Sequence, residues 1–248
     1  MIFSLTRGCY RVLLTGLFVA QNILFAQGLK VTGHVTVLAP ASKGKLVENS
    51  NVVVWLNPLD EATESRASRI QQASARYRLA QGSKRFTPHI LVVPEGAVVE
   101  FPNYDPFFHN VFSLFDGKRF DLGLYEAGST RKVAFNSPGV SYIFCNIHPE
   151  MSAVVIVTKS PYYAISNAAG DVVLSAVPPG RYQLNIWHER CLPETLRALS
   201  REVDVSASSS SLGELHLSEF GDLLSNHKNK YGRAYDPTAT SDLVYGRQ

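Results

Sequence analysis

Short strand-like runs, separated by turn-forming clusters, constrain the fold of this 248-residue chain more than any other feature. The runs are rich in Val, Ile, Phe and Tyr, which favour extended structure, and Pro, Gly, Asn and Asp stand between them. They lie at residues 31–38, 51–56, 89–93, 97–101, 109–114, 131–135, 140–145, 153–157, 171–176, 182–187 and 203–206. No helical segments alternate with them. The pattern therefore predicts an all-β protein built from antiparallel sandwiches or barrels.

Residues 1–26 are interpreted as a signal peptide. Arg7 and Arg11 precede an apolar run at 12–25, and the small residue Ala26 follows it. A basic start, a short apolar run and a small residue are typical of a cleavable secretory signal. We therefore expect a periplasmic or otherwise exported protein whose mature chain has no membrane span. The alternative is that the segment stays uncleaved as an N-terminal anchor.

The charge of the mature chain gives no indication of a polyanionic partner. Removing residues 1–26 takes two arginines and no acids from the 24 basic and 21 acidic residues, which leaves 22 against 21. No basic stripe is present either. We therefore expect no binding to nucleic acid or to an anionic membrane.

Two stretches depart from the strand pattern. Residues 61–80 are rich in Arg, Ser, Ala and Gln with little apolar periodicity, which predicts a solvated connector with a helical turn or two. Residues 220–248 are polar with few apolar anchors, which predicts an extended or poorly ordered tail.

One short string offers several metal-binding side chains. Cys145, His148 and Met151 lie within seven residues, and His109 precedes them in another strand-like run. Two His, one Cys and a weak axial Met are the ligands of a blue-copper electron-transfer site. Soft sulfur ligands suit Cu(I), while imidazoles also suit Cu(II). The composition therefore predicts one type 1 copper ion bound by His109, Cys145, His148 and Met151.

Strand geometry supports this ligand set. Alternation along 140–145 places Cys145 on the same face as Ser141 and Ile143, so that its side chain enters the interior where the strand ends. A tight loop then returns His148 and Met151 to the same point, and a neighbouring strand presents His109. Pro149 fixes its own φ and has no amide hydrogen, which stiffens the loop and removes a donor beside the site.

The Cys-x2-His-x2-Met spacing, with His109-Asn110-Val111 upstream, resembles the cupredoxins, and the two-residue final gap resembles amicyanin rather than plastocyanin. The resemblance covers residues 81–158 and implies a Greek-key β-sandwich. It also implies that Asn110 ties the His109 strand to the ligand loop by hydrogen bonds. Strings at 86–88, 99–103 and 120–125 resemble a subgroup of exported plastocyanin-like proteins often labelled methylamine-utilisation proteins. Nothing in the sequence indicates methylamine chemistry.

A second resemblance lies outside this region. Residues 163–187, with the turn Pro178-Pro179-Gly180, are similar to the carboxypeptidase-regulatory-like β-sandwich, and the runs at 31–35 and 52–56 are similar to its first strands. We therefore expect residues 28–60 and 159–219 to form one small, discontinuous sandwich into which the cupredoxin is inserted. The alternative is that the N-terminal strands extend the cupredoxin sheet.

A structural alternative for the ligand string is a disulfide between Cys145 and Cys191, the two cysteines outside the predicted signal peptide. Against it, Met151 is the sole methionine of the predicted mature chain, and it stands where an axial ligand belongs. The remaining histidines have no second ligand type at useful spacing and are interpreted as structural, surface or tail residues: His34, His89, His188, His216 and His227.

The sequence therefore favours an exported one-electron carrier that works with a redox partner protein. No Ser-His-Asp signature or phosphate loop is present, so we expect no enzyme. Periplasmic copper binding or delivery is the first alternative, although such proteins usually carry labile Met- or His-rich clusters. A non-redox binding module is the second, and it rests on sandwich architecture alone.

Overall fold

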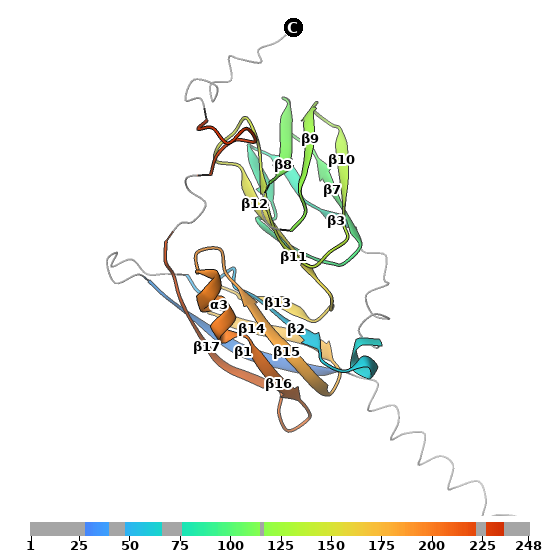
Figure 1. The fold of residues 1–248 in the computed structure, drawn as a ribbon, viewed down its shortest axis with the longest axis vertical. Helices are drawn as coiled ribbons and strands as arrows, with labels where there is room; N and C mark the ends of the chain where they lie inside the picture. The colour runs from blue at the N-terminus through green and yellow to red at the C-terminus, as the bar shows by residue number, and fades with distance from the viewer. Residues whose placement is uncertain (1–27, 40–47, 66–75, 115–116, 222–226, 236–248) are drawn as a thin grey trace, which may run out of the picture.

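The computed structural model describes residues 28–39, 48–65, 76–114, 117–221 and 227–235 (Figure 1). The predicted signal peptide at 1–26 lies outside the described residues, as do 66–75 of the predicted connector and 222–226 and 236–248 of the predicted tail. Within the described ranges, no helix has the length and apolar character needed to cross a membrane.

The all-β prediction is confirmed, because strands make up most of the described chain. A helical turn at 61–65 and one short helix accompany them. The elements are β1 (Leu29–Leu38), β2 (Val53–Pro58), β3 (Tyr77–Arg78), β4 (Ala80–Gly82), β5 (Arg85–Thr87), β6 (Ile90–Pro94), β7 (Ala97–Pro102), β8 (His109–Ser113), β9 (Phe120–Tyr125), β10 (Thr130–Phe135), β11 (Gly139–Phe144), β12 (Ser152–Thr158), β13 (Tyr163–Ile165), β14 (Asp171–Val177), β15 (Gly180–Trp187), α3 (Pro193–Leu199), β16 (Arg201–Val205) and β17 (Ser211–Ser218).

Residues 77–158 form what we call the central sandwich. One of its sheets has the strand order β6-β12-β11-β8-β9, and the other has the order β10-β7-β3. Inward-facing residues of the two sheets make one apolar core, in which Phe101, Phe135 and Ile143 are almost fully buried. This packing buries enough apolar surface to hold the two sheets face to face.

Strands from both ends of the described chain form a second body, which we call the split sandwich. Its sheets have the orders β14-β1-β17 and β13-β2-β15-β16 (Figure 1). In the described residues, β1 pairs with β14 and β17, and β2 pairs with β13 and β15, so neither extends the central sandwich. This pairing is the one that an inserted central sandwich requires. The division of the chain into independent domains stays a prediction.

The two sandwiches share apolar surface through strand β12, which is buried along almost its whole length. Its Val155 packs inside the central sandwich, while Val154 and Ile156 join the core of the split sandwich. From the neighbouring strand β6, Ile90 and Val92 join the same core. A strand that is buried on both faces typically has a continuous run of residues such as Val and Ile, and the sequence of β12 contains such a run.

Two boundaries differ from the sequence expectation. Strand β3 lies within the predicted connector and pairs with β7, so the central sandwich begins before Gln81. Within the predicted tail, residues 227–235 pack against the loop that carries the predicted ligands. These contacts join side chains to main-chain groups and follow no apolar periodicity, so the strand pattern gives no sign of them.

Candidate metal centre

The predicted ligands come from two neighbouring strands and the loop that follows one of them. His109 is the first residue of β8, and Cys145 directly follows β11. Met151 directly precedes β12, so the residues from Cys145 to Met151 form a tight connection between two paired strands. We call this connection, residues 145–151, the ligand loop.

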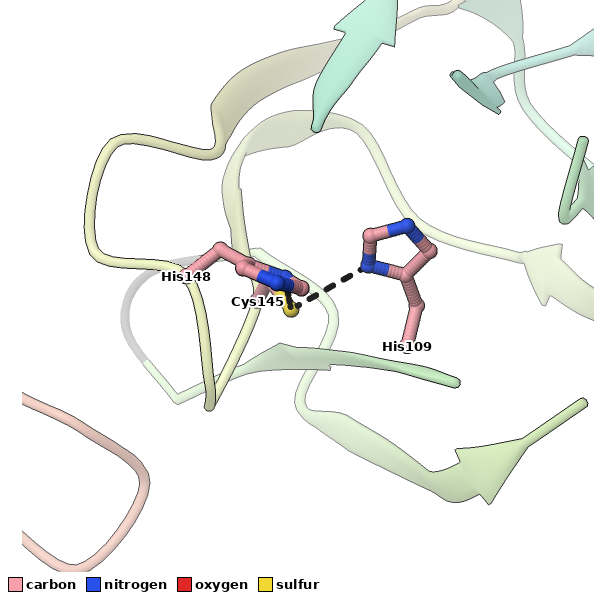
Figure 2. A group of neighbouring side chains, drawn as sticks. All are labelled: His109, Cys145 and His148. Atoms are coloured by element: carbon pink, nitrogen blue, oxygen red, sulfur yellow. Dashed lines mark hydrogen bonds between the residues drawn. The ribbon is translucent and has the colours of Figure 1, made fainter. Parts of the chain in front are cut away.

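Three donor atoms converge in a buried space (Figure 2). The Cys145 Sγ lies 3.8 Å from His109 Nδ1 and 3.5 Å from His148 Nδ1. The three donor atoms all lie within 4.8 Å of one another. Cys145 and His109 are fully buried, and His148 is 8% exposed.

The ligand loop is closed by its own main chain. The Cys145 N–H donates to the Met151 carbonyl at 3.2 Å, and the Met151 N–H donates to the His148 carbonyl at 3.1 Å. Met151 is fully buried in the same apolar core as Cys145. The backbone therefore holds Met151 beside Cys145, as an axial ligand requires.

A carboxylate that the sequence analysis missed fixes the His109 ring. Asp105 Oδ2 lies 2.8 Å from His109 Nε2, so this nitrogen carries the proton and leaves Nδ1 free to bind a metal. The amides of Ser83 and Lys84 donate to the two Asp105 oxygens at 2.6 and 3.0 Å. Asp105 stands four residues before His109, and that spacing was the available signal.

The charge state of this pair follows from its contacts. Burial works against ionisation of Asp105, but hydrogen bonds from Lys84, His109 and Ser83 outweigh it and lower the pKa of the carboxyl. Burial lowers the pKa of His109, although Asp105 opposes the shift. The pair is therefore a carboxylate beside a neutral imidazole, which is the form that binds a metal.

Burial also determines the protonation of the other two donors. It raises the pKa of the Cys145 thiol, an effect that backbone N–H groups of Asn110, Ile147 and His148 oppose. Burial and the neighbouring His109 lower the pKa of His148 to about 4. Without a metal, the site therefore holds a neutral thiol and neutral rings, and metal binding would release the thiol proton.

An aromatic side chain packs against both imidazoles. The Phe107 ring lies edge-on to His109 at a centroid distance of 5.2 Å and 5.6 Å from the His148 ring. Phe107 limits the rotation of both rings and keeps water away from them. This role could not be predicted from the sequence, because nothing there distinguishes Phe107 from the exposed Phe108.

Asn110 and Pro149 are the two residues that the sequence predicts to support the ligands, and the structure shows the contacts of each. Asn110 directs its backbone N–H at the Cys145 sulfur, while its side-chain nitrogen donates to Asp121 of β9 at 2.7 Å. Pro149 lies in the ligand loop, and its carbonyl is 2.7 Å from His227 Nε2. Asn110 thus contacts the ligand loop through its main chain, and its side chain ties β8 to β9.

The disulfide alternative is not realised, because Cys145 and Cys191 are both buried free thiols. Cys191 Sγ lies 3.5 Å from His188 Nδ1 in the split sandwich. Within the described residues, no second group of three His, Cys, Asp or Glu side chains converges as the first does.

The donor set fits a copper ion. Among the described residues, the converging donor atoms are one thiol sulfur and two imidazole nitrogens with no carboxylate oxygen in the group, and a buried Met follows in the same loop. This combination of soft sulfur and imidazole ligands suits copper in either oxidation state.

No protein-family model and no curated protein sequence matches this chain. Several solved structures are similar to about a third of it. A Cu-containing nitrite reductase from Thermus scotoductus SA-01 is 24% identical with a TM-score of 0.32, and the match covers 34% of this chain and 22% of the reductase. A purple cupredoxin from Nitrosopumilus maritimus is 24% identical with a TM-score of 0.30, covering 33% of this chain and 99% of that protein.

A reduced Cu(I) form of an amicyanin variant is 18% identical with a TM-score of 0.32, covering 36% of this chain and 88% of amicyanin. No comparison supports the resemblance to carboxypeptidase-regulatory-like domains. These three matches cover between 33% and 36% of this chain.

Proposed function

We propose that this chain is an exported, copper-binding protein of the cupredoxin class that transfers single electrons through a type 1 site. His109, Cys145, His148 and Met151 would hold the copper ion. The observation that carries the proposal is the convergence of one buried thiol and two imidazole Nδ1 atoms within 4.8 Å. Export rests on the sequence of residues 1–26 alone.

A bound copper ion would supply the one-electron chemistry by alternating between Cu(I) and Cu(II). The residues of the chain hold the ligands in a geometry that suits both states. Asp105 fixes the His109 ring, and Phe107 restricts both rings. The main-chain bonds between Cys145 and Met151 close the loop. Because these groups are held from several sides, little needs to rearrange when the charge of the site changes.

We propose an electron carrier that exchanges electrons with a redox partner protein, and no catalytic activity of its own. The three donors are buried and Phe107 covers both rings, which leaves little room for a substrate beside the metal. The likeness to a nitrite reductase spans only 22% of that enzyme and gives no reason to propose reductase activity.

Visible absorption of the copper-loaded protein tests the proposal. We expect one copper per chain, with an intense thiolate-to-copper band that disappears in Cys145→Ser. Cys191→Ser is the matched control, because it removes the other buried thiol and should leave the band unchanged. A colourless copper-loaded wild type would contradict a type 1 site.

Redox behaviour separates the remaining alternatives. Rapid, reversible reduction of the bound copper supports electron transfer. Ready loss of copper to a chelator would instead favour a role in copper delivery, and failure to bind any copper would favour a non-redox binding module.

A further inference from the structure

A C-terminal segment of the chain returns to the outer side of the ligand loop. Residues 219–221 still belong to the split sandwich, where the Glu219 N–H donates to the Leu38 carbonyl at 3.0 Å. Residues 227–235, drawn in dark red in Figure 1, lie beside the central sandwich. We call residues 227–235 the C-terminal clamp.

Two side chains of the clamp bind main-chain carbonyls of the ligand loop. His227 Nε2 donates to the Pro149 carbonyl at 2.7 Å, and the Tyr235 hydroxyl donates to the Cys145 carbonyl at 2.8 Å. The Tyr235 hydroxyl also lies 3.3 Å from His227 Nδ1. The His227 ring stacks on Phe144, with ring centroids 4.1 Å apart and an interplanar angle of 29°. The two side chains therefore contact one another while they bind the loop at Cys145 and at Pro149.

A third residue of the clamp, Lys230, extends these contacts towards β8, the strand that carries His109. The Lys230 N–H donates to Asn146 Oδ1 at 3.1 Å, and Lys230 Nζ lies 2.8 Å from Asp121 Oδ2. The other oxygen of Asp121 accepts the hydrogen bond from Asn110, the neighbour of His109. The clamp thus contacts the ligand loop directly and the His109 strand through one intermediate carboxylate.

The clamp contacts are additional to the hydrogen bonds that the ligand loop makes within itself. Within the loop, the main-chain bonds join Cys145 to Met151 and Met151 to His148. The clamp contacts involve other groups, namely the carbonyls of Cys145 and Pro149 and the side chain of Asn146. Opening the loop would expose these groups to water and break bonds to the clamp at the same time, so the clamp raises the free energy of opening.

We propose that His227, Lys230 and Tyr235 are positioning residues that hold the ligand loop closed and thereby slow the loss of copper from the site. This inference rests on the proposed function for its copper part. The effect on the loop itself does not require a metal. Because the clamp follows β17 of the split sandwich, it ties that sandwich to the metal site through the chain as well as through shared core residues.

Hydrogen exchange of the metal-free, full-length protein tests the effect on the loop. We expect peptides covering residues 145–151 to exchange about two- to tenfold faster in Tyr235→Phe and in His227→Leu, as the loss of one hydrogen bond predicts. His227→Gln keeps a side-chain N–H that can reach the Pro149 carbonyl, so it should exchange more slowly than His227→Leu. Tyr163→Phe and His216→Leu are matched controls at exposed positions of the split sandwich and should exchange as the wild type does.

Copper release gives the second readout. Transfer of Cu(I) to a chelator should accelerate in Tyr235→Phe and His227→Leu by factors similar to those of loop exchange, while the midpoint of global unfolding stays within error of the wild type. Equal hydrogen exchange of the ligand loop in the wild type, Tyr235→Phe and His227→Leu would overturn the proposal that the clamp holds the loop closed. Failure of the wild type to bind copper would overturn the proposed function, and the exchange result would still decide the clamp.

Discussion

Asp105 orders the site through its hydrogen bonds, although it is not itself one of the proposed metal ligands. It holds the His109 ring by one oxygen and receives two backbone amides. In Asp105→Asn, the amide nitrogen cannot accept a hydrogen bond. If it replaces Oδ2, the bonds from Lys84 and His109 are both lost, and if it replaces Oδ1, the bond from Ser83 is lost, so the side chain that fixes the ring makes fewer hydrogen bonds in either orientation. We expect copper affinity to fall about 10–100-fold, as for other residues that orient metal ligands.

Competition with a chelator of known affinity measures this change. Asp171→Asn is the matched control, because Asp171 also faces a histidine, His34, at 3.5 Å but on the exposed surface of the split sandwich. The control should bind copper as the wild type does. Wild-type affinity in Asp105→Asn would show that Asp105 does not orient His109.

There is a physical reason why the proposed ligands could be predicted from the sequence and Asp105 could not. Cys145, His148 and Met151 could be predicted because one loop carries all three and their chemical types are rare together. His109 could be added because its neighbours resemble those of a known ligand. Asp105 could not be recognised as a partner of His109, since carboxylates at this spacing are common and only the turn before β8 brings the two together.

Strand β12 is the element on which both sandwiches depend. Ile156 is almost fully buried in the core that β12 shares with the split sandwich. Replacing it by alanine leaves a cavity between two rigid sheets, so Ile156→Ala should lower the free energy of unfolding by about 2–5 kcal/mol. Denaturant titration measures the loss, and Val98→Ala at an exposed position of β7 should change stability by less than about 0.5 kcal/mol. An equally small change in Ile156→Ala would mean that the two sandwiches do not share a core.

A polar contact beside the same interface should make stability depend on pH. His89, just before β6, has Nε2 2.7 Å from Glu189, just after β15, and Nδ1 3.2 Å from the Ser152 carbonyl. The hydrogen bond to Glu189 raises the pKa of His89 above its ordinary value of about 6.5. A histidine whose pKa is raised on folding adds stability that is fully present below the unfolded pKa and is lost as the pH rises through the folded pKa.

The difference in unfolding free energy between the wild type and Glu189→Gln should therefore shrink as the pH rises from about 6 to about 9. Burial lowers the pKa of His188 to about 4, so in the folded protein that ring stays neutral across this range. Glu202→Gln removes an exposed carboxylate that faces Arg181 rather than a histidine, and its difference from the wild type should not change over the same range. A constant difference for Glu189→Gln would contradict the contribution of His89.

The positions of the strands could be predicted from the sequence better than their pairing partners. The runs at 140–145 and 153–157 correspond to β11 and β12, because Val, Ile and Phe dominate them. Strand β9 could not be predicted from the apolar pattern, because only Tyr125 of its residues is buried. Helix α3 was also missed, since its seven residues bury only Leu196 and give no apolar periodicity.

At the scale of the whole molecule, three features connect the two sandwiches: the shared core around β12, the His89–Glu189 contact and the C-terminal clamp. The pairing of β1 and β2 with later strands could be predicted, because their sequences resemble the start of the sandwich that β14 and β15 complete. The extent of the shared core could not be predicted, because an apolar run does not reveal which partner covers each face.

This shared core leads to a prediction about residues 76–158 expressed alone. The fragment keeps the strands of the central sandwich and the predicted ligand set. It exposes four buried apolar side chains, Ile90, Val92, Val154 and Ile156, beside the partly buried Val140 and Tyr142. An exposed patch of this kind favours association, so the unmodified fragment should aggregate. Replacing all four residues by threonine keeps β-branched side chains on the strands and makes the face polar. This variant should be a soluble monomer by sedimentation.

The threonine variant then tests whether the central sandwich holds the metal site independently. We expect it to bind one copper with an absorption band that disappears in Cys145→Ser, because the four proposed ligands and Asp105 all lie within the fragment. Its ligand loop should exchange hydrogen faster than in the full chain, since the fragment lacks the C-terminal clamp. A folded threonine variant that binds no copper would show that the central sandwich is not an independent copper domain. A soluble, monomeric unmodified fragment would show that the apolar face needs no cover.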